Sequence, residues 1–217
     1  MAGGLRYKFH GSNIKVLTGY DAESPSKAIT AITKANPAVV SITAHGLVDG
    51  DVVKITGVAG MTEVNNGVFV VNQLTSGTFQ LVDTDSTGYG TYTSGGLMDK
   101  GAFSNLCELT NYNRQGGTSP EIAATTICST AQEYEIGLPD FGTTQIDFNF
   151  APLTAVQGAL HDFYLSGEKM AVQVVLPNAG GNMVQLGFVQ QESETAAVGG
   201  LYTASATIRN TGNRYDY

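Results

Sequence analysis

Pairs of carboxylates at short spacing are the residues of this sequence best suited to catalysis or metal binding. Glu133 and Glu135 flank Tyr134, so in a strand both point to one face, where two carboxylates can form an acid–base pair. Asp83 and Asp85 alternate in the same way and could supply oxygen ligands to Ca²⁺, but the glutamate that completes a calcium loop is missing. We therefore expect a polar turn at the aspartates and an acidic or solvated strand face at the glutamates.

Two further motifs resemble catalytic sequences but lack their context. Asp140-Phe141-Gly142 has the letters of the kinase magnesium motif, yet the glycine-rich loop, strand lysine and catalytic loop of kinases are missing. His161 beside Asp162 is more simply explained as a solvated pair on a helix. The sequence also lacks a phosphate-binding loop, a nucleophile elbow and a zinc-protease motif. It predicts no enzyme, no cofactor and no metal site.

The cysteines and histidines do not form a metal-binding pattern. Cys107 and Cys128 are far apart in the chain, and the three histidines are scattered. The preferred interpretation is two buried or unpaired thiols in a protein made in a reducing cytoplasm, and a disulfide between them is the alternative.

Composition excludes several classes of protein. Charged residues make up 14%, hydrophobic residues make up 42%, and glycine accounts for 27 of 217 positions, which favours a turn-rich β protein over a helical or disordered one. The net charge of −8 argues against a surface that grips DNA phosphates. No apolar run is long enough to span a membrane, and the N-terminus does not resemble a secretory signal.

The elements that would position these residues fall into two blocks. Residues 27–98 contain short strands separated by turn signals and predict a small all-β barrel or sandwich whose exit is Gly95-Gly96. Residues 1–26 contain one candidate strand, Ile14–Leu17. The acidity lies mainly in residues 99–217, which carry five basic and twelve acidic side chains.

Residues 99–217 predict an antiparallel β-sandwich with one helix against it. Phe103–Tyr112 is a candidate strand, and Asn113–Gln132 is expected to be a loop that becomes ordered only against a neighbouring subunit. A helix is expected from Pro152, with Leu153, Val156, Leu160, Phe163 and Tyr164 on one apolar stripe and Gly167 at its end. The other expected strands are Thr143–Phe150, Met170–Pro177, Met183–Ser193 and Leu201–Arg209.

The segment Ala124–Phe150 resembles the signature of the major tail tube proteins of long-tailed bacteriophages. It has a Thr/Ser-rich stretch, an acidic and hydrophobic strand, a Gly-Leu-Pro-Asp-Phe-Gly turn and an alternating strand, and the later elements follow in the order of that family. The resemblance covers residues 1–26 and 99–217. Residues 27–98 are similar to a small β-module inserted in various phage structural proteins, so we expect an inserted decoration domain there.

The resemblance implies a structural virion protein of the phage tail, made in the host bacterial cytoplasm. Its subunits would form hexameric rings stacked into a tube that holds the tape-measure protein, meets tail terminator and tail-tip proteins, and passes genomic DNA without specific binding. Glu133, Glu135 and Asp147 are candidate lumen carboxylates, with Asp147 expected in the same sheet as the glutamates. The expected contacts between subunits and rings are Arg114, Gln115, Gly116, Gly117, Thr118, Ser119, Pro120 and Glu121.

Two other functions fit a β-sandwich without catalytic motifs. One is a different phage tail protein, such as a terminator, sheath-like or baseplate component. The other is a carbohydrate-binding adhesion module, which usually exposes aromatic side chains on one concave face. This sequence has no tryptophan, and its ten tyrosines are spread along the chain.

Overall fold

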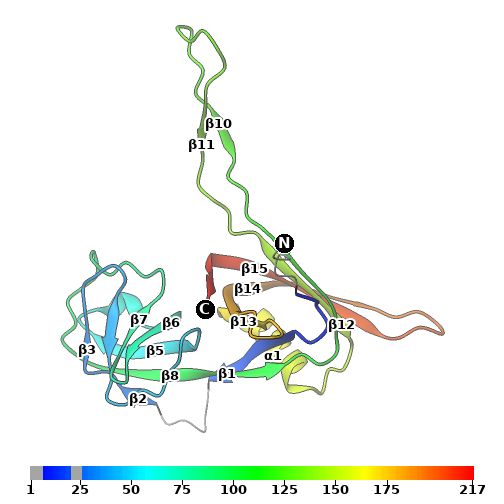
Figure 1. Cartoon of the computed structure of the whole chain (residues 1–217), viewed down its shortest axis with the longest axis horizontal. Helices are drawn as coiled ribbons and strands as arrows, with labels where there is room; N and C mark the ends of the chain where they lie inside the picture. The colour runs from blue at the N-terminus through cyan, green and yellow to red at the C-terminus, as the bar shows by residue number, and fades with distance from the viewer. Residues whose placement is uncertain (1–6, 21–25) are drawn as a thin grey trace, which may run out of the picture.

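The computed structural model describes residues 7–20 and 26–217, so parts of the predicted 1–26 segment lie outside the described residues. Every strand pairing in it is antiparallel, and one α-helix lies against the strands (Figure 1). The prediction of a mainly β, antiparallel architecture with one flanking helix is confirmed. The hydrogen-bonded strand path is β3-β4-β7-β6-β5-β8-β1-β13-β14-β15-β12-β9, with β2 paired to β8 and with β10 and β11 forming a separate sheet.

The first block contains six short strands around its own apolar cluster. Alternation puts Val53 and Ile55 of β5 and Phe79 and Leu81 of β7 inside, all completely buried. A 3-10 turn, Thr62–Val64, follows β5. The strands are β2 (Lys27–Ala28), β3 (Ala31–Ile32), β4 (Val39–Ser41), β5 (Val52–Ala59), β6 (Gly67–Thr75) and β7 (Thr78–Leu81).

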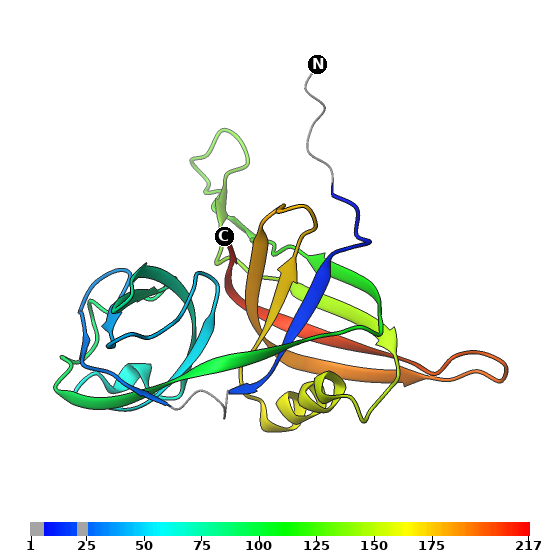
Figure 2. The same cartoon turned by 60° about the horizontal axis from the view of Figure 1, so that its bottom comes forward.

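One long strand, β8 (Ser94–Asn105), belongs to both halves of the molecule. Its first part pairs with β5 and β2, and its last part pairs with β1 (Asn13–Tyr20). Lys27 lies directly opposite Met98, so the chain enters and leaves the block at adjacent positions. The predicted exit at Gly95-Gly96 and the predicted boundary after residue 98 therefore both fall inside a continuous strand (Figure 2).

The two halves also share apolar packing. Val52, Val68 and Val70 come from the block but pack in the cluster of the second half, which includes Leu17 and Met170. An ion pair joins the halves as well, with the Lys54 Nζ and Glu168 Oε1 atoms 3.0 Å apart. The division of the chain into two domains stays a prediction, and the packing adds that their cores are in contact.

The second half is a strongly curved sheet around that cluster (Figure 2). In β12, the predicted alternation is confirmed because Thr144, Ile146 and Phe148 are buried while Gln145 and Asp147 are half-buried on the other face. The remaining strands of this sheet are β9 (Leu109–Gln115), β12 (Thr143–Asn149), β13 (Met170–Val175), β14 (Asn182–Thr195) and β15 (Thr203–Asp216).

Helix α1 (Ala155–Ser166) covers part of the sheet and begins three residues later than predicted. Thr154 is its N-cap, because its hydroxyl accepts a hydrogen bond from the Gln157 N–H. Leu153 therefore lies outside the helix and is fully exposed. Tyr164 is also exposed, so the buried part of the predicted stripe is Val156, Leu160 and Phe163. The predicted end is confirmed, since Gly167 has φ 66°, which favours glycine.

Two predictions for residues 103–132 are wrong. The single strand expected over Phe103–Tyr112 is two strands, because the chain turns at Cys107-Glu108 between β8 and β9. The loop expected over Asn113–Gln132 contains the end of β9 and all of β10 (Glu121–Ala123), which pairs with β11 (Tyr134–Ile136). This segment is one side of a long hairpin.

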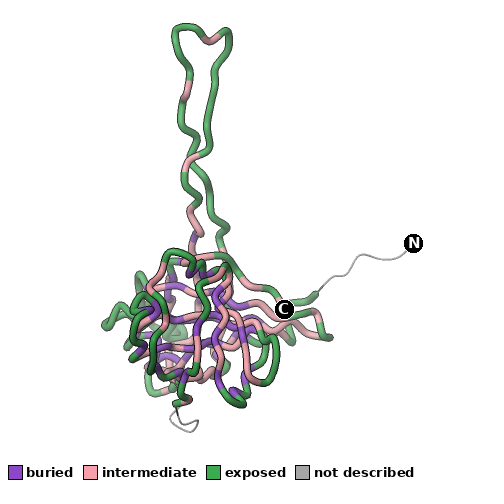
Figure 3. Tube along the Cα trace, turned by 90° about the vertical axis from the view of Figure 1, so that its left-hand side faces the viewer, coloured by how far each residue is buried: buried purple, intermediate pink, exposed green. Residues whose placement is uncertain are grey.

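That hairpin, residues 116–142, projects far from the rest of the chain and is called the arm below (Figures 1 and 3). It continues from the ends of the paired strands β9 and β12. At its base, a Cβ on Gly117 would lie 1.4 Å from the Asp140 carbonyl oxygen, so only glycine lets the two sides approach. Almost every arm residue is exposed.

Candidate assembly surfaces

The strand register gives the arm two chemically different faces. Ala123 lies opposite Tyr134, and Ile122 lies opposite Glu135. Directly opposite residues of an antiparallel pair share a face, and successive residues alternate. One face therefore carries Glu121, Ala123, Tyr134 and Ile136, and the other carries Ile122 and Glu135.

The first face is mainly apolar and open to solvent, and Glu121, opposite Ile136, is its one charged residue among the paired positions. Tyr134 is 56% exposed and Ile136 is 80% exposed, and Leu138, two residues further on, is 89% exposed. Ile127 near the tip is fully exposed. Contiguous apolar side chains on a thin projection cannot be buried by their own chain, and such surfaces mark sites of association.

The second face is acidic. Glu133 lies just before β11. The Ala124 N–H donates a hydrogen bond to the Glu133 carbonyl, which continues the pairing of β10 with β11, so side chains keep alternating between the two faces up to Glu133. The Ser129 hydroxyl donates to the Glu133 carboxylate over 3.1 Å. Glu133 and Glu135 therefore share a face, which agrees with their spacing in the sequence, and Ile122 accompanies them there.

Asp147 does not join these two glutamates. It lies in β12 of the main sheet, whereas Glu135 lies in the separate two-stranded sheet of the arm, so the expectation of one shared sheet is wrong. Its carboxylate accepts hydrogen bonds of 2.9 Å from Asn111 and from Gln145.

The residues predicted as subunit contacts occupy the base of the arm. Arg114 is half-buried, donates to the Gln185 side chain over 3.2 Å, and has an Nε atom without a partner among the described residues. Gly117 has the steric role described above. The others are exposed at the end of β9 or along the first side of the arm: Gln115, Gly116, Thr118, Ser119, Pro120 and Glu121.

The motifs that resembled catalytic sequences have structural surroundings. Asp140 accepts a hydrogen bond from the Gly142 N–H, which is the main cause that lowers its pKa, and its pairing with Arg209 over 2.7 Å lowers that pKa further. Asp85 accepts two hydrogen bonds from Thr87, which closes a polar turn. Within residues 7–20 and 26–217, no group of three or more His, Cys, Asp or Glu side chains could hold a metal ion. Both cysteines are exposed and unpaired.

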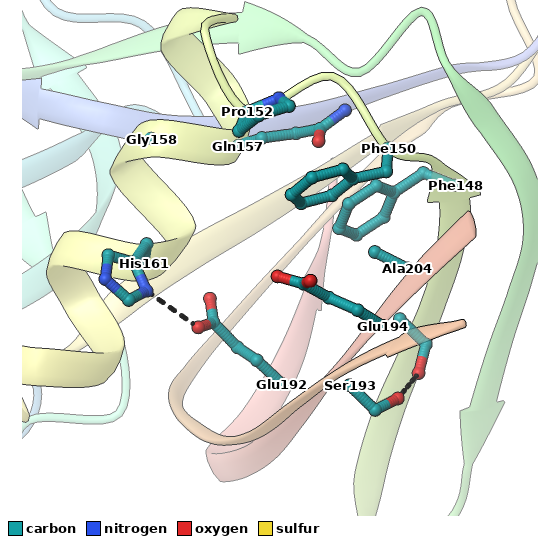
Figure 4. A pocket seen from close by; sticks show the side chains of 11 residues that line it. Phe148, Phe150, Pro152, Gln157, Gly158, His161, Glu192, Ser193, Glu194 and Ala204 are labelled. Carbon is teal, nitrogen blue, oxygen red and sulfur yellow. Dashed lines mark hydrogen bonds and ion pairs between the residues drawn. The ribbon is translucent and has the colours of Figure 1, made fainter. Parts of the chain in front are cut away.

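A pocket of about 240 Å³ lies between α1 and the hairpin of β14 and β15 (Figure 4). Its floor is apolar, with Phe148, Phe150 and Ala204, and two carboxylates, Glu192 and Glu194, line its side. The Glu192 carboxylate lies 3.0 Å from His161 Nδ1, and this hydrogen bond is the main cause that raises the histidine pKa.

Sequence reasoning missed these two glutamates because a β-bulge determines where they point. Val189 is buried, so strict alternation would turn Gln191 inward. The register with β15 shifts between Val189 and Gln191, which places Glu192 opposite Ala206 and Glu194 opposite Ala204, both buried. The two carboxylates therefore lie on the face of the sheet that forms the core.

Comparisons with known proteins match parts of the chain. Residues 35–100 match the family model of the ubiquitin-activating enzyme E1 FCCH domain, which overlaps the first block. The chain is also similar to a hybrid solid-state NMR and cryo-EM structure of the SPP1 tail tube, at 13% sequence identity and a TM-score of 0.42. That match covers 53% of this chain and 67% of the other.

No helix among the described residues has the length and apolar character needed to cross a membrane.

Proposed function

We propose that this protein is a non-enzymatic structural subunit that polymerises with copies of itself into the tail tube of a long-tailed bacteriophage. The observation that carries the proposal is the arm, a hairpin with an exposed apolar face that its own chain cannot cover. The signature at Ala124–Phe150, which spans most of the arm, supports the same assignment. In the proposed assembly, hexameric rings stack, and the arm of each subunit packs on a neighbouring copy.

The two faces of the arm suggest how it is oriented in the assembly. Burial of an exposed isoleucine or tyrosine side chain stabilises a contact by about 1.5–3 kcal/mol, whereas burial of an unpaired carboxylate is unfavourable. The face of Tyr134 and Ile136 is thus proposed to contact protein, and the face of Glu133 and Glu135 to remain in water. If that water fills the tube lumen, the carboxylates repel DNA phosphates and allow DNA to pass without binding.

Imaging of the purified chain tests the proposed function. We expect concentrated protein to form long hollow filaments or stacked rings in negative-stain electron microscopy, with sixfold symmetry in end views. A chain that remains monomeric at all concentrations contradicts the proposal. A monomer whose properties shift on addition of glycans would support an adhesion module.

A charge reversal on the arm tests the proposed lumen. Glu133→Lys with Glu135→Lys changes each subunit by four charge units, and both side chains are exposed, so folding should change by less than about 0.5 kcal/mol. We expect the variant tubes to bind DNA with a strong dependence on salt, measured by co-sedimentation at low ionic strength. The matched control is Glu133→Gln with Glu135→Gln, which removes the negative charges without adding positive ones. If tubes of the Glu133→Lys/Glu135→Lys variant do not bind DNA, these side chains lie outside the lumen.

A further inference from the structure

The pocket beside α1 is a place where the core is left uncovered. Opposite pairs form two rows across the sheet, one of Phe148, Ala204 and Glu194 and the other of Ile146, Ala206 and Glu192. Each row begins with a buried apolar side chain and ends with a carboxylate on the same face. Helix α1 borders this area with Gln157, Gly158 and His161 (Figure 4).

The groups around this pocket are acidic and aromatic. Glu192 is paired with His161, Glu194 accepts a 2.7 Å hydrogen bond from the Tyr202 hydroxyl, and Asp162 adds negative charge near His161. The Phe150 ring packs on Tyr202, with the ring centroids 4.6 Å apart. An occupant that fits this chemistry carries basic groups on one side and apolar rings on the other.

The N-terminal segment of this chain has that composition. Arg6, Lys8 and His10 alternate with Tyr7 and Phe9 in the sequence, so in an extended conformation the basic and aromatic side chains point to opposite sides. Tyr7 is 42% exposed and Phe9 is 52% exposed. We infer that the pocket receives this N-terminal segment from a second copy of the chain.

The described part of this segment lies at the other end of β14 from the pocket of its own chain. The Tyr7 ring lies against Gly180, in the turn between β13 and β14, where an added Cβ would come within 2.5 Å of it. From Asn182, next to that turn, β14 runs ten residues along the curved sheet to Glu192 in the pocket. Figure 2 shows residues 7–12 and α1 on opposite sides of the curved sheet.

The charge of the arm argues against it as the occupant. The arm has the acidic residues Glu121, Glu133, Glu135 and Asp140 and no basic residue, so it would bring like charges to Glu192 and Glu194. A contact between the N-terminal segment and the pocket joins different surfaces of two copies, so it can repeat head to tail along a stack. The inference thus deepens the proposed function and rests on it for its role in stacking.

Binding of a labelled peptide tests the inference without requiring polymerisation. A fluorescent peptide of residues 2–12 is titrated with full-length protein below its polymerisation concentration, and anisotropy is measured. We expect saturable binding that weakens about tenfold when Arg6 and Lys8 of the peptide are replaced by glutamate, because two attractions become repulsions. That comparison leaves the protein unchanged, so folding cannot affect it.

Reversal of the pocket charges is the reciprocal test. Glu192→Lys with Glu194→Lys should weaken binding of the wild-type peptide about tenfold. The same variant should restore binding of the peptide in which Arg6 and Lys8 are replaced by glutamate. The inference is overturned if the peptide does not bind, or if its affinity is unchanged both by the charge reversal in the peptide and by the charge reversal in the pocket. Preferential binding of an arm peptide, residues 118–138, at this pocket would also overturn it. Peptide binding without tubes contradicts only the proposed function, and tubes without peptide binding contradict only the inference.

Discussion

Replacing Tyr134 by serine and Ile136 by aspartate should abolish polymerisation while leaving a folded monomer. Both side chains are more than half exposed in the single chain, so the free energy of unfolding should change by no more than about 0.5 kcal/mol. If both are buried between copies, their loss costs about 4 kcal/mol per contact, which weakens association about a thousandfold. Sedimentation velocity and negative-stain microscopy measure the assembly, and circular dichroism measures the fold.

The opposite face of the arm provides the matched control for this variant. Glu133→Gln with Glu135→Gln changes two residues of the same hairpin but leaves the apolar face intact. We expect that control to polymerise as the wild-type chain does. Wild-type polymerisation of the Tyr134→Ser/Ile136→Asp chain would exclude the apolar face from the subunit contact.

Excision of the first block should destabilise the rest of the chain. The sequence suggests that Ser26 can be joined to Leu97 by a short Gly/Ser linker with little effect, and the Lys27–Met98 pairing makes that connection short. However, Val52, Val68 and Val70 would leave the core of the second half. Their loss costs about 5 kcal/mol, which is comparable to the whole stability of a small protein. We expect the shortened chain to aggregate or to melt far below the wild-type temperature.

A full-length variant separates lost packing from the effects of a deletion. Val68→Ala with Val70→Ala keeps the block and removes only part of the shared contact, at about 1–2 kcal/mol for each residue. It should lower the melting temperature in the same direction by a smaller amount. A shortened chain that melts at the wild-type temperature would contradict the shared core and favour an independent inserted domain.

The sequence predicts elements well where a single side-chain period controls burial. The alternation of Ile146 and Phe148 with polar residues gives both the existence and the inward face of β12. The start of α1 is less well predicted, because Pro152 is an acceptable first helical residue while the observed cap is the hydroxyl of Thr154. Local propensity cannot choose between two start signals that are two residues apart.

The assembly surfaces are harder to predict because they depend on register. The composition around Gly116-Gly117 indicates a loop, and the two sides of the arm are brought together by the pairing of β10 with β11 and by the close approach of Gly117 to Asp140. The spacing of Glu133 and Glu135 does predict their common face, since two-residue periodicity needs no partner strand. Glu192 and Glu194 could not be assigned to the core face, because the bulge is visible only in the pairing with β15.

The continuity of β8 determines the direction in which the first block faces. A flexible linker would let such a block sample many orientations, but a twelve-residue strand with partners in both halves, together with the Lys54–Glu168 ion pair, restricts them. Every copy then presents the block at the same angle to its own curved sheet. In any periodic assembly, the blocks would form an ordered lattice with the repeat of the subunits. Antibody fragments bound to them would be seen in averaged images as discrete, regularly spaced density.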